Sequence, residues 1–420
     1  MEKHLLSKST FIRGVQCLKS LYLNKKRPFL RDRLPQERMI VFRRGHEVGG
    51  LAQQLFPGGI DMSPGHPSGY RRSVMLTQEK IRSGYPVIYE AGFQYDQILI
   101  FLDILVKTAT GWHAYEVKSS RGISPTYLMD AALQYYVIRG TGLDLQSISI
   151  IHIDENYERG DEIEPAKLFK TVHVTDEALS RQEFIRSQIL KEKETLTLPH
   201  SPKIEVGPHC SDPYECDFIG HCWKHVPKVP KKELLQHFNP ELPAAEKSQA
   251  EGNIAFLKVL PIRPAIPLYK GTHPYQPVPY AFALQTANKT MISIYDHLSN
   301  PETELQKQLL QATHDIHAVV CFAQENIVSN LLPGKNIIDL AGFLADDSDL
   351  LFLKDGESLL ENIQKLSGAG TSTPSYTSDP ICAHHYLKAY PSEDVQKNLE
   401  EYSGAWAAAL AELFKQITAR

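Results

Sequence analysis

A small set of polar residues in the first half of the chain has the types needed to cleave phosphodiester bonds with a metal ion. Asp103 lies inside the apolar run ILIFLDILV, and Glu116 and Lys118 follow in the run AYEVKSS. Two carboxylates can hold a divalent cation such as Mg²⁺ or Mn²⁺. An ammonium group can stabilise an attacking water or the charge that develops in the transition state. Such a site requires all three side chains to converge.

The surrounding sequence predicts elements that could bring them together. Short runs rich in β-branched, aromatic and aliphatic residues predict three consecutive strands, at 87–93, 97–106 and 111–120. Glu116 and Lys118 are two apart on one strand, so both side chains leave the same face. Asp103 reaches that face if its strand pairs with theirs as a hairpin. Taken alone, an E-x-K pair on a strand is often only an exposed ion pair.

Asp103 and the following helix favour the site over that simpler interpretation. A carboxylate in a buried apolar strand must be paired, hydrogen-bonded or metal-bound, because an isolated buried charge is very costly. Ser124 and Pro125 are a good N-cap and first residue for a helix that continues to about residue 139. That helix carries Asp130 and Gln134 four residues apart, on one face. Gln134 is therefore a fourth candidate, with a role in capping the sheet or facing water as the alternative.

Four cysteines frame this region, one before it and three after it, at Cys17, Cys210, Cys216 and Cys222. Five residues separate each of the last three from the next, whereas zinc sites usually contain one close pair. Irregular spacing with one remote cysteine is more typical of an iron-sulfur cluster. Zinc stays an alternative, with nitrogen ligands available at His209, His221 and His225, and so do plain buried thiols. We expect Cys321 and Cys382 to be unpartnered core or surface cysteines.

Residues 6 to about 223 resemble the RecB-like branch of the PD-(D/E)XK nucleases, in particular the iron-sulfur members related to CRISPR-associated spacer-processing exonucleases. The resemblance implies a restriction-endonuclease-like α/β core with a helical N-terminal region. It implies that Asp103 and Glu116 bind Mg²⁺ or Mn²⁺, that Lys118 assists the reaction, and that Gln134 supports them. It also implies a structural 4Fe-4S cluster held by Cys17, Cys210, Cys216 and Cys222.

Two positions depart from the family pattern. The family's first motif has a metal-binding His one helical turn after a Gly, but here Gly49 stands at that position, with His46 and Glu47 nearby. Many relatives also carry Q-x-x-x-Y, whereas the tyrosines here, Tyr135 and Tyr136, follow Gln134 directly. The alternative hypotheses are therefore a nucleic-acid-binding or adaptor protein whose nuclease site has decayed, and a zinc-stabilised structural protein.

Composition limits these hypotheses without deciding between them. The 420 residues are 42% hydrophobic with a formal net charge of −4, which predicts a soluble globular protein of two or three domains. Residues 1 to 44 hold twelve Lys or Arg against three acids, as a phosphodiester substrate would require, although a solvated basic helix face would look the same. No long apolar run or secretory signal is evident, so we expect no membrane association and a cytoplasmic location.

The domain boundary is predicted after the cysteine segment. We expect a nuclease domain at 1–225, a linker rich in Lys and Pro at 226–245, and a second α/β domain at 246–420. The second half resembles a domain of unknown function related to DnaQ-like exonucleases, with an RNase H-like fold. Where active relatives carry D-x-E this chain has Lys258 and Leu260, and Asp339 alone matches a later motif. We therefore expect a catalytically silent domain that holds DNA or a protein partner.

Together these features predict a Mg²⁺- or Mn²⁺-dependent DNA nuclease, acting on DNA ends or single strands in repair or defence.

Overall fold

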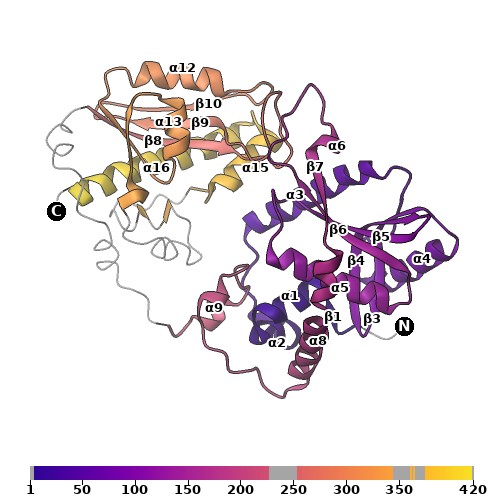
Figure 1. Ribbon diagram of the computed structural model, residues 1–420. Coiled ribbons are helices and arrows are strands. Elements are labelled where there is room, and N and C mark those ends of the chain that lie inside the picture. The colour runs from indigo at the N-terminus through magenta and orange to yellow at the C-terminus, as the bar shows by residue number, and fades with distance from the viewer. Residues whose placement is uncertain (1–3, 227–252, 344–359, 362, 365–373, 419–420) are drawn as a thin grey trace. The chain divides into compact units, whose positions relative to one another are not determined.

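The computed structural model describes residues 4–226, 253–343, 360–361, 363–364 and 374–418 (Figure 1). The chain forms two compact units, one of Met1–Val226 with Ala265–Pro274 and the other of Pro227–Pro264 with Tyr275–Arg420. The expected linker lies outside the described residues except for Val226. The return of 265–274 to the first unit was not expected from the sequence. The backbone of Arg159 bonds with Gly271 and Thr272 of this segment.

The first unit is built on one mixed sheet. Its strands lie in the order β2-β3-β4-β5-β6-β7, and β1 pairs with β4. β3, β4 and β5 are antiparallel neighbours, whereas β5 and β6 are parallel. The strands are β1 (Leu6–Ser7), β2 (Ile60–Asp61), β3 (Val87–Tyr95), β4 (Ile98–Thr108), β5 (Gly111–Lys118), β6 (Leu145–Ile153) and β7 (Phe169–His173). Parallel strands need a crossover, and a helix between β5 and β6 supplies it.

That crossover helix is α5 (Pro125–Gly140), and it begins as its sequence predicts. Ser124 is the N-cap, and its hydroxyl accepts the backbone N–H of Tyr127 at 3.3 Å. α5 packs on β3, β4 and β6 through buried residues such as Leu133 and Val137. The three strands expected from the sequence also form, as β3, β4 and β5.

The remaining helices of this unit lie around α5 and the sheet (Figure 1). α1 packs against α2, α5 and α8, while α4 covers β3 and α3 packs against β5. They are α1 (Lys8–Gln16), α2 (Leu18–Lys26), α3 (Gln36–Ala52), α4 (Tyr70–Arg82), α6 (Pro165–Leu168), α7 (Thr175–Ser180), α8 (Gln182–Thr197) and α9 (Ile219–Cys222), with the 3₁₀ turns η1 (Pro28–Leu30), η2 (Gln53–Leu55), η3 (Pro67–Gly69) and η4 (Pro208–Cys210). The expected helical N-terminal region is therefore present.

The second unit is a separate α/β layer structure. Its sheet has the order β10-β9-β8-β11-β12, in which β8, β9 and β10 are antiparallel while β11 and β12 run parallel to β8. The strands are β8 (Ile254–Ile262), β9 (Val278–Gln285), β10 (Thr290–Ile294), β11 (Ala318–Cys321) and β12 (Asn336–Asp339). The helices are α12 (Glu302–Ala312), α13 (Glu325–Leu331), α15 (Asp379–Ala389) and α16 (Glu393–Thr418), with the 3₁₀ turn η6 (Leu340–Phe343).

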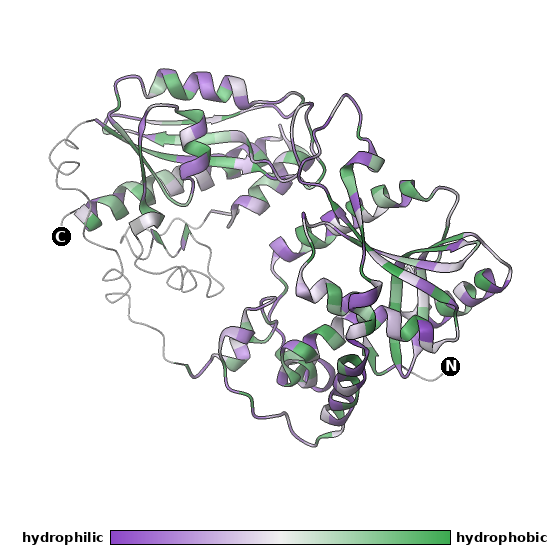
Figure 2. Cartoon of the chain, viewed as in Figure 1, coloured by the Kyte–Doolittle hydropathy of each residue, from purple (hydrophilic) through white to green (hydrophobic). Residues whose placement is uncertain are grey.

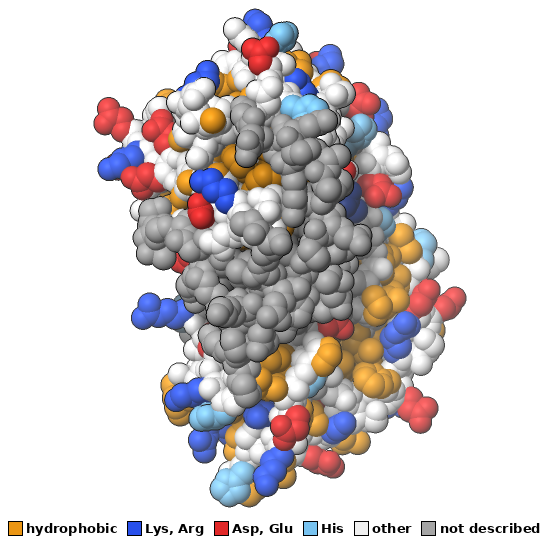
Figure 3. Space-filling view, turned by 90° about the vertical axis from the view of Figure 1, so that its left-hand side faces the viewer, with side chains coloured by type: hydrophobic (Ala, Val, Ile, Leu, Met, Phe, Trp, Pro, Cys, Tyr) orange, Lys and Arg blue, Asp and Glu red, His pale blue; other side chains and the backbone are white. Residues whose placement is uncertain are grey.

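Hydropathy follows these layers. Strands of both sheets are mainly hydrophobic, whereas the helices carry both kinds of residue (Figure 2). The face shown in Figure 3 has Lys and Arg side chains interspersed with Asp and Glu, as a net charge of −4 allows. Among the described helices, none has the length and apolarity required to cross a membrane.

Candidate active site

Asp103 lies where β4 and β5 part. The antiparallel ladder between them ends at the pair Ile104 and Tyr115. One step further, the side chain of Asp103 takes over the bonding, because the backbone N–H of Val117 donates to its Oδ2 at 2.6 Å. On the other end of β4, the short strand β1 pairs with it. The opening between β4 and β5 therefore begins at Asp103, where the ladder between the two strands ends.

Lys118 joins two carboxylates on the exposed side of this opening. Its Nζ donates to Oε1 of Glu116 and to Oδ2 of Asp130, each at 2.6 Å. The side chains of Glu116 and Asp130 are only 2% and 8% exposed. Gln134 donates from Nε2 to Oε2 of Glu116 at 2.8 Å. The structure therefore brings Glu116, Lys118 and Gln134 together as the sequence indicated, and adds Asp130.

A second ammonium group enters from the N-terminal region. Lys8 Nζ lies 2.7 Å from Oε1 of Glu116 and 3.8 Å from Oδ2 of Asp130. Lys8 is the first residue of α1, and the preceding Ser7 forms a capping box with Thr10, which fixes the direction in which the helix begins. Sequence reasoning missed Lys8 because 108 positions separate it from Glu116, and only the pairing of β1 with β4 makes them neighbours.

A fourth carboxylate, Glu90 on β3, is also missing from the sequence prediction. It lies close enough to interact electrostatically with Lys8 and Glu116. Its backbone has a positive φ of 49°, an uncommon conformation for a residue with a side chain. The β3–β4 ladder registers the residues on either side of it, Tyr89 and Ala91, but not Glu90. Such local strain is frequently found at functional sites.

Burial and crowding separate the acidities of these groups. Burial raises the pKa of Asp103 well above its ordinary value, and the negative charge of Glu116 adds to the effect. Burial also raises the pKa of Glu90 to about 7. In Glu116 burial opposes ionisation, but Lys118 and Lys8 outweigh it and hold the pKa below the ordinary value. Such opposed pKa shifts within one cluster are typical of functional sites.

The donor set is chemically suited to a hard divalent cation. Four carboxylates, on Glu90, Asp103, Glu116 and Asp130, surround two ammonium groups, so the fully ionised cluster carries excess negative charge. Two buried oxygens, Oδ1 of Asp130 and Oε1 of Gln134, have no hydrogen-bond partner. Carboxylate and carbonyl oxygens are the ligands of Mg²⁺ and Mn²⁺. Within the described part of the chain, no group of three or more acidic, His or Cys side chains is arranged to hold a metal ion. Lys8 and Lys118 lie against the carboxylates of Glu116 and Asp130.

The residues at the two positions that depart from the nuclease pattern lie on α3 and α5. His46 and Glu47 are exposed on α3, and a Cβ added to Gly49 would have no heavy atom within 4 Å. Tyr136 instead donates to Oδ2 of Asp96 at 3.2 Å, and Tyr135 packs against the hydrophobic core.

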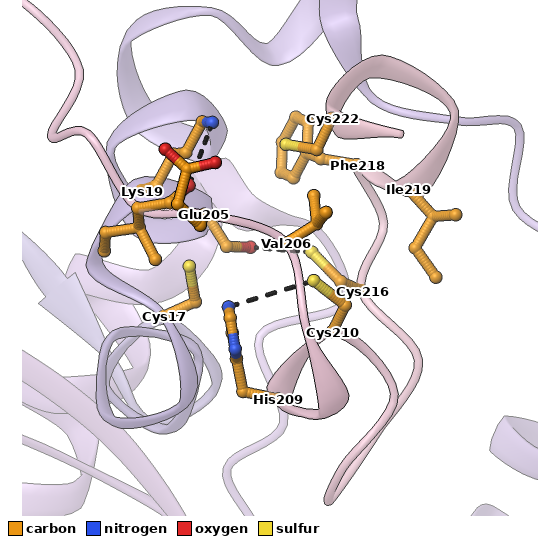
Figure 4. A pocket seen from close by; sticks show the side chains of 12 residues that line it. Cys17, Lys19, Glu205, Val206, His209, Cys210, Cys216, Phe218, Ile219 and Cys222 are labelled. Atoms are coloured by element: carbon orange, nitrogen blue, oxygen red, sulfur yellow. Dashed lines mark hydrogen bonds between the residues drawn. The ribbon is translucent and has the colours of Figure 1, made fainter. Parts of the chain in front are cut away.

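The four framing cysteines line a single pocket in the first unit. Cys17 lies between α1 and α2, while Cys210, Cys216 and Cys222 lie on the segment around η4 and α9, and Figure 4 shows their sulfur atoms directed toward a common space. Hydrophobic side chains, among them Phe218 and Ile219, complete the lining. The pocket thus joins the two ends of the unit, which the sequence separates by almost two hundred residues.

The thiols interact with each other but form no disulfide. All six cysteines of the chain are described, and all are free. Burial raises the pKa of Cys17 and of Cys222, and the other cysteines of the pocket add to it. Cys216 donates to Oγ of Ser20 at 3.3 Å, and Cys210 lies 3.8 Å from Nε2 of His209. A group that binds thiolates would relieve the cost of ionising four neighbouring thiols.

The nitrogen ligands considered for zinc are only partly available. His209 lines the pocket, whereas His221 and His225 are exposed and lie outside its lining. Cys321 and Cys382 are buried in the second unit, as core cysteines.

In the second unit, the residues at the expected motif positions have structural partners. Lys258 is 4% exposed, forms an ion pair with Asp379 at 2.8 Å, and lies over the ring of Trp406. Leu260 is fully buried in the sheet. Both carboxylate oxygens of Asp339 accept backbone N–H groups, from Ala323, Gln324, Glu325 and Ala341. Asp339 therefore serves as a cap where α13 begins.

Comparisons with known proteins add little to this geometry. No family model matches the chain, and no curated protein matches it. A solved structure titled "Crystal structure of SSO0001" is 14% identical, with the match covering 53% of this chain and 87% of that chain at a TM-score of 0.22. A likeness at that TM-score carries no argument about fold or function.

Proposed function

We propose that the first unit is a metal-dependent DNA nuclease with a PD-(D/E)XK-type core, acting on DNA ends or single strands. The proposal depends on one observation: Asp103, Glu116 and Lys118 meet where β4 and β5 part, with Gln134 bonded to Glu116. An ordinary surface ion pair would need neither the burial nor the four-carboxylate surroundings of this cluster.

In this proposal each residue has a defined task. Asp103 and Glu116 hold Mg²⁺ or Mn²⁺, which supplies Lewis-acid polarisation of a phosphate and of water. Lys118, whose pKa the carboxylates of Asp130 and Glu116 raise despite burial, stays protonated and stabilises negative charge on phosphate oxygens. Gln134 fixes one oxygen of Glu116 through its hydrogen bond. Lys8 and Asp130 limit the direction in which Lys118 and Glu116 can turn.

We further propose that the cysteine pocket holds a 4Fe-4S cluster with an architectural role. Four thiols from both ends of the unit line one pocket, and thiolates are the usual ligands of such clusters. A single zinc ion needs its ligands within about 2.3 Å, whereas a cluster of several irons and sulfides spans more widely separated thiolates. Losing one ligand should loosen α1 and α2 from the late segment.

For the second unit we propose an RNase H-like fold that is catalytically inactive and serves as a scaffold. Its strand order and directions are compatible with that fold. Asp339 has its oxygens engaged by backbone groups, and Lys258 occupies a position at which active relatives need an acid. A protein partner or a stretch of DNA could be held on this unit without chemistry occurring there.

A cleavage assay tests the main proposal. Protein purified without oxygen is incubated with end-labelled single-stranded and duplex DNA in Mn²⁺, alongside Asp103→Asn and Lys118→Ala. We expect cleavage by the unmodified chain and a loss on the order of 10³-fold in each variant. Lys193→Ala, which removes a lysine paired with Asp96 elsewhere in the unit, should cleave normally. Full cleavage by both site variants would remove the assignment.

A second candidate function rests on Gly49. Since no imidazole stands at that position, a decayed nuclease that only binds nucleic acid is the competing hypothesis. It predicts retained binding of the same labelled DNA with no degradation by any variant. A colourless protein containing zinc and binding no DNA would favour the third hypothesis, whereas a brown protein containing iron would exclude it.

A further inference from the structure

A basic arm precedes and includes the first half of α3. We define it as residues 25–44, which cover the end of α2, the turn η1 and the α3 helix to Arg44. Eight Lys or Arg residues in this arm stand against two acids, Asp32 and Glu37. The whole chain has a formal net charge of −4, so the residues outside the arm are acidic overall. The arm is thus a local concentration of positive charge.

The same arm exposes large apolar side chains. Phe29 is 78% exposed and Phe42 is 51% exposed. Three others in the arm are also exposed, namely Leu34, Met39 and Val41. Over its whole length α3 buries only Val48 and Ala52. Isolated exposed apolar residues are ordinary, but five within fourteen positions are a concentration that suits a binding surface.

The arm is nevertheless fixed in place by the cysteine segment. Asp217, which lies between Cys216 and Cys222, forms an ion pair with Arg38. Its Oδ2 also lies 3.6 Å from Nε of Arg31. Asp32 anchors the same contact, because its backbone N–H donates to the Asp217 carbonyl at 2.8 Å.

Gly220 allows this contact to be close. Its N–H donates to Oδ2 of Asp32 at 3.0 Å, and a Cβ added there would lie 2.5 Å from Oδ1 of Asp32. The exposed aromatic and basic groups are therefore presented on a fixed platform.

We propose that the basic arm is a docking surface for single-stranded nucleic acid, on which Phe29 and Phe42 stack with bases while Lys26, Arg27 and Arg33 neutralise phosphates. The choice of a DNA-like substrate rests on the proposed function. A single strand presents base faces and phosphates together, and aromatic residues beside cations bind it without reading its sequence. A duplex hides its base faces. An apolar protein partner would not need the excess of cations.

The arm also leads toward the candidate active site. α3 continues from the arm and packs against β5, the strand that carries Glu116 and Lys118. A strand held on the arm would lie on an element in direct contact with the wall of the site.

Fluorescence anisotropy with labelled oligothymidine in EDTA measures binding separately from cleavage. All proteins are full-length and carry Asp103→Asn, so that no product forms. The pair Phe29→Ala and Phe42→Ala should weaken binding on the order of 30-fold, because each stacked base contributes about 1 kcal/mol or more. Its matched control, Phe184→Ala with Leu190→Ala, removes side chains of 44% and 60% exposure on α8 and should leave affinity unchanged.

Charge reversal tests the phosphate contacts. Lys26→Glu, Arg27→Glu and Arg33→Glu together should flatten the dependence of binding on salt by about two logarithmic units of slope, as three lost phosphate contacts predict for a single strand. Arg186→Glu with Lys191→Glu on α8 serves as control. Urea unfolding of each variant must match the parent, which separates a lost contact from a lost fold.

The outcomes separate this proposal from the nuclease proposal. The docking surface is supported if the Phe29→Ala, Phe42→Ala variant loses more affinity for oligothymidine than for duplex DNA, relative to the parent. Unchanged binding by both sets of arm variants overturns it, and so does an equal loss for single strand and duplex, which would mean charge attraction alone. If the unmodified chain cleaves DNA but the arm variants bind oligothymidine as well as the parent does, only the docking proposal is wrong. If the arm variants lose binding but the unmodified chain cleaves no DNA, only the nuclease proposal is wrong.

Discussion

In the first unit, four carboxylates surround Lys8 and Lys118, and buried oxygens of Asp130 and Gln134 have no hydrogen-bond partner. In the second unit, Asp339 accepts backbone N–H groups and Lys258 is paired with Asp379. Both regions bury charge beside a sheet. The first resembles a site that still needs a cation, and the second resembles a folded scaffold. If the proposed function is right, the supply of hydrogen-bond and ion-pair partners, rather than the presence of an acid, separates the chemical role of the first cluster from the structural role of the second.

The same Asp→Asn substitution, made once in each unit, should give the largest difference in cleavage and in stability. Asp103→Asn keeps an acceptor for the Val117 N–H but removes charge, so cleavage should fall by about 10³-fold while stability changes little. Asp339→Asn replaces one oxygen by an amino group facing backbone N–H donors. It should destabilise the protein by about 3 kcal/mol without altering cleavage. Cleavage rates and urea unfolding curves of both variants measure this; the reverse assignment of effects would break the comparison.

The buried lysine of the second unit sharpens the contrast further. Among the described side chains, Lys258→Met leaves Asp379 with the hydroxyl of Tyr402, at 3.0 Å, as its hydrogen-bond partner, and should cost about 3 kcal/mol of unfolding free energy. Adding Asp379→Asn to it should recover much of that loss. Thermal unfolding and cleavage assays on both variants provide the check. A large loss of cleavage would show that the second unit contributes to the chemistry.

Two glutamates of the first unit differ in the same way. Glu116 is paired with two lysines, whereas Glu192 on α8 is buried with a hydrogen bond from Gln188 to only one of its oxygens. Burial raises the pKa of Glu192 to about 8, although the Gln188 contact opposes this. Glu192 also packs on α1, because a Cβ on Gly14 would lie 2.3 Å from its Cδ.

Glu192 should therefore weaken the fold as the pH rises. Its folded pKa lies above the unfolded value, so its stabilising contribution is complete below about pH 4.5 and is lost as the pH rises through about 8. The expected slope within this window is at most about 1.4 kcal/mol per pH unit. Urea unfolding at pH 6 and 7 should show it in the parent and not in Glu192→Gln. Identical pH slopes in the two proteins would refute the assignment.

The smallest expected effect concerns Gly49. Ala at this helical position meets no neighbour and should stabilise the protein by about 0.5 kcal/mol, with cleavage unchanged. Thermal unfolding of Gly49→Ala detects the gain. A clear destabilisation would contradict the open surroundings of this position.

The parts of the site that could be predicted from the sequence are those that depend on residues close together in the chain. Short runs of β-branched, aromatic and aliphatic residues predict β4 and β5, and the Ser124 cap predicts α5. The two-residue spacing of Glu116 and Lys118 puts both on one face of β5, and Gln134 lies on the face of α5 that it shares with Asp130. Lys8 and Glu90 carried no such signal. Lys8 depends on a two-residue strand, and Glu90 on an unusual backbone conformation inside an ordinary strand sequence.

Longer-range features were equally hidden. Residues 265–274 return to the first unit through backbone bonds, for which a loop sequence gives no warning. The structural role of Lys258 depends on Asp379, 121 positions away. That of Asp339 depends on the backbone at the start of α13. Only the fold decides whether such charges are satisfied.

The central claim is that the first unit binds a divalent cation through its carboxylates, and Mn²⁺ binding measured by electron paramagnetic resonance tests it most directly. Full-length protein should remove the signal of free Mn²⁺, Asp103→Asn combined with Glu116→Gln should weaken this binding at least about tenfold, and Asp339→Asn should leave it intact. Equal Mn²⁺ binding by the parent and by the double variant, or no binding by the parent, would contradict the account.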